Sequence, residues 1–181
     1  RDYPIAELRE KTGAVLQKAV LFKGSIRENL AWGNADATEE EMNRALEIAQ
    51  AKEFVDTKEG GLDFVIEQGG KNLSGGQRQA LTLLMATMVT PKILLLDEHT
   101  AALDPKTAEL IMQLTDKIVK EKKLTTIMVT HNLRYAVDYG NRLLMMHQGN
   151  AVMDLKGEEK ADLQVDDILD KFNEISIECG N

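Results

Sequence analysis

Residues 92–98 read KILLLDE, a continuous apolar run that ends in two acidic residues, Asp97 and Glu98. A run of this length is typical of a strand buried on both faces of a parallel sheet. Open parallel sheets bind ligands at the carboxyl ends of their strands, where these acids would lie. Because a buried carboxylate pair is costly without a cation, we expect Asp97 to hold Mg²⁺, directly or through water, and Glu98 to polarise a water molecule. For the two acids alone, the simpler interpretation is that they only terminate a strand.

Helix and strand patterns alternate around this run. Residues 74–89 predict a helix in which Ser74 is the N-cap and Gln77 completes a capping box. Residues 104–122 predict a second helix with Asp104 at its cap, and residues 124–131 predict a second buried strand that ends at His131. This alternation favours an α/β fold with a mainly parallel sheet and crossover helices.

The flanking segments have simpler patterns. Residues 25–33 and 38–55 begin with capping boxes and predict a small helical region, and residues 58–72 predict a loop with two glycine pairs. After residue 131, the pattern predicts a short helix, a hairpin and a closing amphipathic helix over residues 165–175.

Composition excludes several classes of protein. A chain of 181 residues with 43% hydrophobic residues fits one domain, and its net charge of -8 argues against a nucleic-acid partner, because phosphate neutralisation needs clustered Lys and Arg. The single cysteine, Cys179, rules out a disulfide framework and a paired-cysteine metal site, and fits a reducing compartment. No apolar run approaches the length of a membrane span, so any work at a membrane would require a partner.

The segment NLSGGQRQA, residues 72–80, predicts an anion site at a helix tip. Unpaired N–H groups and the helix dipole face outward there, and two glycines let a phosphate approach closely. Taken alone, this segment is weak evidence for a binding site. Gln17, which follows a short strand, could be an ordinary turn residue, and Asp104 could be only a helix cap. A lone His131 is weak evidence as well. Their combination with the acidic pair strengthens each of them.

In this order, the motifs resemble those of the nucleotide-binding domain of ABC transporters. Gln17 resembles the Q-loop, residues 73–77 the signature motif, residues 93–98 the Walker B strand with its catalytic carboxylate, residues 101–104 the D-loop, and His131 the switch histidine. The resemblance implies a partial P-loop NTPase fold: a mainly parallel sheet with crossover helices plus a small helical subdomain. It also implies three regions of one incomplete domain, namely residues 1–24 around the Q-loop, 25–72 as the helical subdomain, and 73–181 as the signature helix and C-terminal core.

The same resemblance assigns ATP and Mg²⁺ as cofactors and gives each residue a role. Glu98 is implied as the general base, Asp97 as the Mg²⁺ partner, Gln17 as a sensor of the metal and of the membrane subunit, and His131 as a contact to the γ-phosphate. The tip residues Ser74, Gly75, Gly76 and Gln77 are implied to contact ATP held by a second nucleotide-binding domain, with Asp104 at the seam of that dimer. The implied location is cytoplasmic, at the inner face of the cell membrane, through a transmembrane partner.

Two departures from the family pattern stand out. The family's phosphate cradle, G-x-x-x-x-G-K-[ST], is not found in the sequence, so we expect the chain alone to bind ATP weakly and to lack meaningful ATPase activity. In addition, the residues up to about 72, above all 8–41, resemble exporters, whereas residues 83–111 and 128–149 resemble stand-alone ATPase subunits of importer-like systems. We therefore hypothesise that the chain is a chimera with a recombinant or engineered junction near the signature motif.

Two alternatives remain open. One is a soluble ATPase of the same type that acts in DNA repair or translation, against which the acidic balance and the exporter-like residues 21–33 weigh. The other is a non-enzymatic folding or interaction module. ATPase activity measured with and without a partner that bears the cradle would separate this module from the transporter ATPase.

Overall fold

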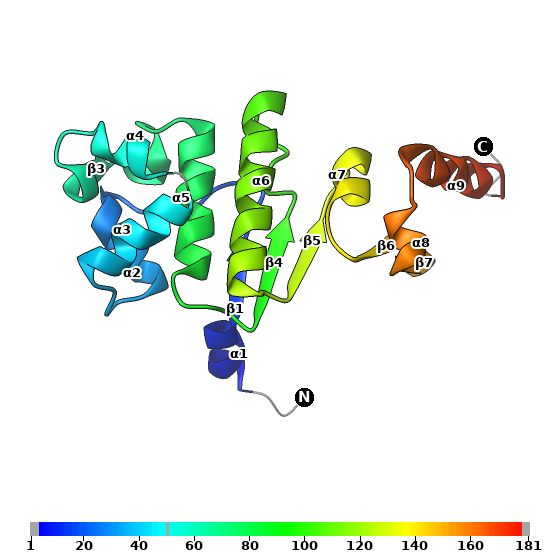
Figure 1. The fold of residues 1–181 in the computed structure, drawn as a ribbon, viewed down its shortest axis with the longest axis horizontal. Coiled ribbons are helices and arrows are strands. Elements are labelled where there is room, and N and C mark those ends of the chain that lie inside the picture. Colours follow the sequence, from blue (N-terminus) through cyan, green and yellow to red (C-terminus); the bar gives the residue numbers. More distant parts are fainter. Residues whose placement is uncertain (1–3, 50, 179–181) are drawn as a thin grey trace. The chain divides into compact units, whose positions relative to one another are not determined.

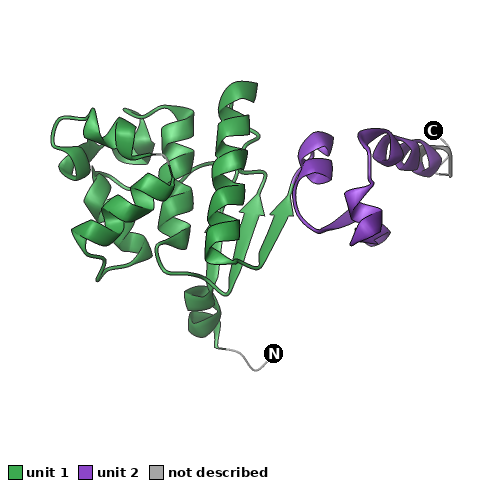
Figure 2. Ribbon diagram, viewed as in Figure 1, with its two compact units in different colours: residues 1–129 green, residues 130–181 purple. Residues whose placement is uncertain are grey.

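The structure, a computed structural model, describes residues 4–49 and 51–178. The chain divides into two compact units, residues 1–129 (unit 1) and residues 130–181 (unit 2), shown in Figure 2. The predicted helical region therefore lies within the larger unit, together with the acidic strand and the signature helix. His131 belongs to the smaller unit.

A three-stranded parallel sheet forms the centre of unit 1 (Figure 1). Its strand order is β1 (Thr12–Val15), β4 (Ile93–Asp97) and β5 (Thr126–Val129). In register, Val15 lies opposite Leu96, and Asp97 lies opposite Val129. The acidic strand is thus the central strand, and its carboxyl end lies beside that of β5. The predicted parallel α/β arrangement is confirmed.

Helices α5 (Gly75–Thr87) and α6 (Pro105–Lys122) cover one face of this sheet (Figure 1). Leu94 and Leu96 point into that layer and are 0% and 2% exposed. The prediction that β4 is buried on both faces is wrong, because Leu95 is 37% exposed and Ile127 of β5 is 54% exposed. Successive strand residues alternate between faces, and both helices pack on the same face of the sheet.

The helical region contains α2 (Ile26–Gly33), α3 (Glu39–Ile48) and α4 (Lys52–Asp56), and α1 (Ile5–Lys11) precedes the sheet. The capping boxes predicted at the starts of α2 and α3 are both present. The predicted loop over residues 58–72 includes two 3-10 turns, η1 (Gly61–Asp63) and η2 (Gln68–Gly70), and a short strand, β3 (Val65–Ile66), that pairs with β2 (Gly24–Ser25). Arg27 joins this region by ion pairs of 2.8 Å to both Glu39 and Asp63.

Unit 2 has its own small core. It comprises α7 (Leu133–Asp138), the antiparallel hairpin of β6 (Arg142–His147) and β7 (Asn150–Lys156), α8 (Glu158–Ala161) and α9 (Val165–Glu178). The predicted hairpin and closing helix are confirmed. Its core consists of the buried residues Leu143, Met145, Leu163, Ile168 and Ile175. Across the described residues of both units, every helix is too short or too polar to cross a membrane.

Candidate functional site

The turn that follows β4 carries the two predicted acids. Asp97 is the last residue of the strand and is exposed, whereas Glu98 is half-buried. The expectation of a buried acidic pair is therefore wrong. Asp97 shares the outward face of β4 with Leu95, because side chains two residues apart point the same way. Both acids nevertheless lie at the carboxyl end of the central parallel strand, as predicted.

The backbone at Glu98 has an unusual conformation. Its φ angle is 45°, in the left-handed region that side chains other than glycine rarely adopt. The Glu98 N–H donates to the carbonyl of Val129 in β5 at 2.9 Å, and the Glu98 carbonyl accepts from the Ala101 N–H at 2.9 Å. Strained backbone of this kind persists only where neighbouring contacts fix it, and it is frequent at functional sites.

His99, the next residue, is buried to 2% exposure against α6. Its Nε2 lies 3.1 Å from the Thr115 hydroxyl, and that hydroxyl donates to the Ile111 carbonyl at 2.7 Å. Burial lowers the pKa of His99 to about 4, so the imidazole is neutral near pH 7. Our sequence analysis missed this residue, because its partner lies 16 positions further along the chain and no local pattern joins them.

The tip of α5 has the predicted capping box. The Ser74 hydroxyl oxygen accepts from the Gln77 N–H at 3.2 Å, and the Gln77 side chain accepts from the Ser74 N–H at 3.0 Å. The two glycines differ in how closely they pack: a Cβ at Gly76 would lie only 2.6 Å from Thr107, which requires a shift, whereas one at Gly75 would lie 3.0 Å from the flexible end of Leu103. The structure therefore brings the glycine tip against the residues that flank Asp104.

Asp104 caps α6, as predicted. Its carboxylate accepts from the Thr107 N–H at 3.1 Å. Hydrogen bonds from the Thr107 side chain and then from its backbone N–H hold the pKa of Asp104 below its ordinary value. The side chain is exposed and lies directly before Pro105, the first residue of the helix. The structural role is thus present, and exposure leaves the carboxylate accessible for a second role.

Gln17 lies in a bend two residues after β1 and is exposed. The chain beside it is held by Gln79 of α5, whose side-chain N–H donates to the Leu16 carbonyl at 3.3 Å. Gln79 is 2% exposed. The sequence did not predict this contact, because Gln79 follows Gln77 and Arg78 in α5 and its partner lies 63 residues earlier in the chain.

His131 is exposed and lies in unit 2, just before α7. The following residue, Asn132, caps that helix by accepting from the Tyr135 N–H at 3.2 Å. The local structure of the predicted switch segment is therefore a strand end followed by a capped helix. That His131 acts together with Asp97 and Glu98 remains a prediction.

Magnesium requires oxygen ligands, and it is usually held by one or two carboxylates together with waters and phosphate oxygens. Asp97, exposed at the carboxyl end of β4, offers such a carboxylate, and the Gln17 amide offers a further oxygen. Within the described residues, no group of three or more His, Cys, Asp or Glu side chains could hold a metal ion. Oxygen atoms of Asp97 and Gln17 are of the type that Mg²⁺ binds, and phosphate oxygens could supply further ligands.

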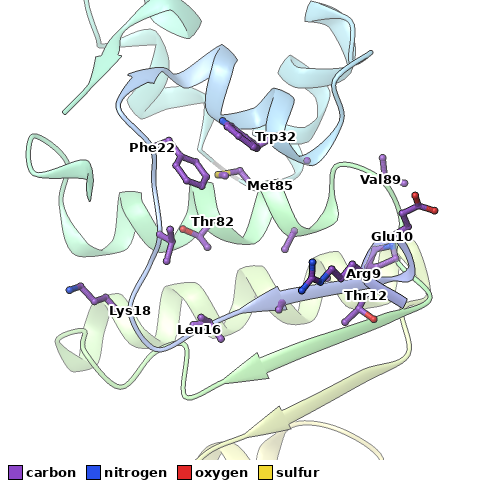
Figure 3. Close-up of a pocket in the computed structure, with 16 residues that line it drawn as sticks. Arg9, Glu10, Thr12, Leu16, Lys18, Phe22, Trp32, Thr82, Met85 and Val89 are labelled. Carbon is purple, nitrogen blue, oxygen red and sulfur yellow. The ribbon is translucent and has the colours of Figure 1, made fainter. Parts of the chain in front are cut away.

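A groove of about 660 Å³ opens between β1, the segment after it, α2 and α5. Figure 3 shows Phe22 and Trp32 above Met85 of α5, with Lys18 and Leu16 further along the groove. The Phe22 and Trp32 rings stack with centroids 4.7 Å apart, yet Trp32 is 69% exposed. The groove is mainly apolar, and Arg9, Glu10 and Lys18 supply charge among its lining residues.

Comparison with known proteins gives a consistent result. A family described as "ABC transporter" matches residues 1–101, more than half of the chain. A protein of Clostridioides difficile described as "Tyrosine transport ATP-binding protein" is 61% identical over 100 residues, which are 55% of this chain and 40% of that protein. An Arabidopsis thaliana protein described as "ABC transporter B family member 21" is 38% identical over 152 residues, 84% of this chain and 12% of its own length.

A third relative is the "ATP-dependent lipid A-core flippase" of Chromobacterium violaceum, which is 36% identical over 148 residues. The match covers 82% of this chain and 25% of the flippase. The chain thus spans well under two thirds of the length of each of these relatives.

Proposed function

The chain belongs to the ABC transporter family, and we propose that it is part of an ATP-binding domain that couples ATP hydrolysis to transport across a membrane. One observation carries the proposal: the central strand of a parallel sheet ends in an exposed carboxylate, Asp97, followed by Glu98 in a conformation fixed by two backbone hydrogen bonds. This is the edge at which such sheets bind their ligands.

In the proposed reaction, Glu98 orients the attacking water and accepts its proton as the water oxygen bonds to the γ-phosphorus and ADP leaves. Asp97 holds Mg²⁺, directly or through water, and Gln17 contributes its amide oxygen. When bound, Mg²⁺ neutralises charge that develops on the phosphate oxygens. His131 contacts the γ-phosphate.

The α5 tip acts on ATP held by a second nucleotide-binding domain. The N–H groups of Gly75 and Gly76 and the positive end of a 13-residue helix favour an anion there. The Ser74 oxygen already accepts from Gln77, so its O–H remains available to donate to a phosphate oxygen. Asp104 lies at the seam between the two domains, next to the residues that pack on the glycines.

The groove is the proposed docking surface for a transmembrane subunit or domain. Exposed aromatic rings beside apolar residues, with a few charges at hand, match the composition of protein interfaces. Because Leu16 and Lys18 line it, a partner in the groove would touch the residues on both sides of Gln17. The chain would then work at the cytoplasmic side of a membrane through this partner.

The 181 residues contain no G-x-x-x-x-G-K-[ST] segment, whose backbone amides and Lys supply much of the affinity for nucleotide in this family. We therefore expect the chain alone to bind ATP weakly and to hydrolyse it negligibly. A titration with labelled ATP and Mg²⁺ checks this expectation, and binding in the micromolar range would contradict it.

The function is tested by adding the chain to an intact ABC ATPase domain whose own signature serine is replaced by arginine. If the α5 tip acts in trans, the chain restores hydrolysis at the partner's ATP. Ser74→Arg in the chain then abolishes this stimulation. Glu98→Gln has no effect, because the 181 residues contain no G-x-x-x-x-G-K-[ST] segment to hold a nucleotide beside Glu98. Stimulation that survives Ser74→Arg, or no stimulation despite complex formation, would count against the proposal.

The role of Glu98 needs a cradle in the same polypeptide. Joining a cradle-bearing segment of a relative ahead of residue 1 provides one. In that protein, Glu98→Gln should lower kcat by roughly 100-fold or more, the usual contribution of a general base, and leave ATP binding unchanged.

A further inference from the structure

We propose that the buried hydrogen bond between His99 and Thr115 is a positioning device that fixes the backbone of Glu98 and thereby the direction of its carboxylate. Its catalytic meaning rests on the role of Glu98 proposed above. The structural claim concerns only the residues of unit 1 and requires no nucleotide.

Glu98 needs external support for its conformation. A φ of 45° is unfavourable for a residue with a Cβ, so the surrounding contacts must outweigh the strain. One contact is the hydrogen bond from the Glu98 N–H to Val129, and another is the short turn closed by the Ala101 N–H. Ala101 and Ala102 are exposed, so the packing that holds the turn comes from His99 and Thr100, which are 2% and 8% exposed.

His99 supplies a further attachment, from its side chain to α6. Its side chain is 2% exposed and reaches α6, and it is covalently next to Glu98. Movement of the Glu98 peptide toward an ordinary right-handed conformation would rotate the His99 Cα and pull Nε2 away from Thr115. The hydrogen bond therefore ties the conformation of Glu98 to the position of a long, well-packed helix.

The direction of this hydrogen bond is fixed. The Thr115 hydroxyl uses its only hydrogen on the Ile111 carbonyl, so toward His99 it can only accept. Nε2 must therefore carry the hydrogen, which selects one neutral tautomer and one ring orientation. A leucine could fill a similar volume without burying an imidazole, but it would supply no directional bond.

Amide hydrogen exchange tests the proposal. The quantity measured is the exchange rate of the Glu98 N–H relative to that of the Leu94 N–H, which lies in β4 and donates to the Thr125 carbonyl. Thr115→Val keeps the shape of the side chain and removes the acceptor. It should raise this ratio about tenfold, because one buried hydrogen bond is lost near Glu98 alone. A general loss of stability would raise both rates equally and leave the ratio unchanged.

Three variants serve as controls. Thr115→Ser and His99→Gln retain the acceptor and the donor respectively, and both should keep the wild-type ratio. Thr82→Val removes a matched hydroxyl that donates to the Arg78 carbonyl at 2.9 Å in α5, and it should not change the ratio. In ¹⁵N spectra, wild-type His99 should show a protonated Nε2 and an unprotonated Nδ1.

The proposal is overturned if Thr115→Val leaves the ratio unchanged, if Thr82→Val raises it equally, or if Thr115→Ser fails to restore it. Should Thr115→Val not fold, the comparison of His99→Leu with His99→Gln decides the same question. Because nucleotide is absent throughout, a failure here leaves the ATPase proposal intact, and failure of the trans-activation experiment leaves this one intact.

Discussion

The tip of α5 and the turn after β4 both present polar groups at an edge of unit 1, but their supports differ. The tip is held by a capping box whose two hydrogen bonds join Ser74 and Gln77, three residues apart. The turn is held by partners in β5 and α6, up to 31 residues away along the chain from Glu98 to Val129. The tip can therefore keep its shape when distant elements shift, whereas the turn must follow them.

The largest difference between the two regions should appear on acidification. The folded-state pKa of His99 is about 4, against an ordinary value of 6.5, because burial disfavours the charged imidazolium. The unfolded chain therefore takes up a proton first as the pH falls. Stability that is fully present above pH 6.5 should be lost between pH 6.5 and 4, by about 3 kcal/mol in total. The tip has no group of this kind in its capping box.

Urea unfolding of wild type and His99→Gln, in buffer free of divalent cations, checks this prediction. Carboxylates contribute to the pH dependence of both proteins. The informative quantity is therefore the free energy of unfolding of wild type minus that of His99→Gln, measured once at pH 7 and once at pH 4. A difference that stays constant across this range would contradict the assignment of a buried, neutral His99.

The next effect tests the contact that joins the two regions. Gly76→Ala would place a Cβ 2.6 Å from the Thr107 methyl group, and the required shift should cost about 2 kcal/mol. Gly75→Ala is the matched control. Its Cβ would lie 3.0 Å from the flexible end of Leu103, and better helix propensity should offset the cost to within about 1 kcal/mol.

Thermal or urea unfolding measures both variants. Equal losses of stability for the two alanines would mean that the tip does not pack on the start of α6 as described. A loss confined to Gly76→Ala would show that this glycine is required for packing against α6.

The same contrast explains what the sequence could predict. Capping boxes at Ser25, Thr38 and Ser74, and the cap at Asp104, follow from residues three positions apart, and all are present in the structure. Apolar runs predicted β4, β5 and the hairpin, whereas β2 was not predicted and β3 lies in a predicted loop; the alternation of helix and strand predicted a parallel sheet. These features depend on local hydrogen bonding and periodicity.

Features that depend on packing could not be predicted. The exposure of Leu95 and Asp97 follows from both helices lying on one face of the sheet, which the apolar run alone does not specify. The partners of His99 and Gln79 lie 16 and 63 residues away along the chain. The family resemblance predicted which residues would touch ATP, but it gave no indication of the residues that hold them in place.

The smallest effect concerns the tip alone. Ser74→Ala removes the oxygen that accepts from the Gln77 N–H and should cost about 1 kcal/mol, the usual value of an N-cap. Because the capping box is local, the relative exchange rate of the Glu98 N–H should stay at its wild-type value. Gln113→Ala, an exposed change within α6, controls for nonspecific effects of substitution. A rise in exchange at Glu98 would mean that the tip and the turn form one cooperative structure through Gly76 and Thr107, and the contrast between local and distant support would no longer hold.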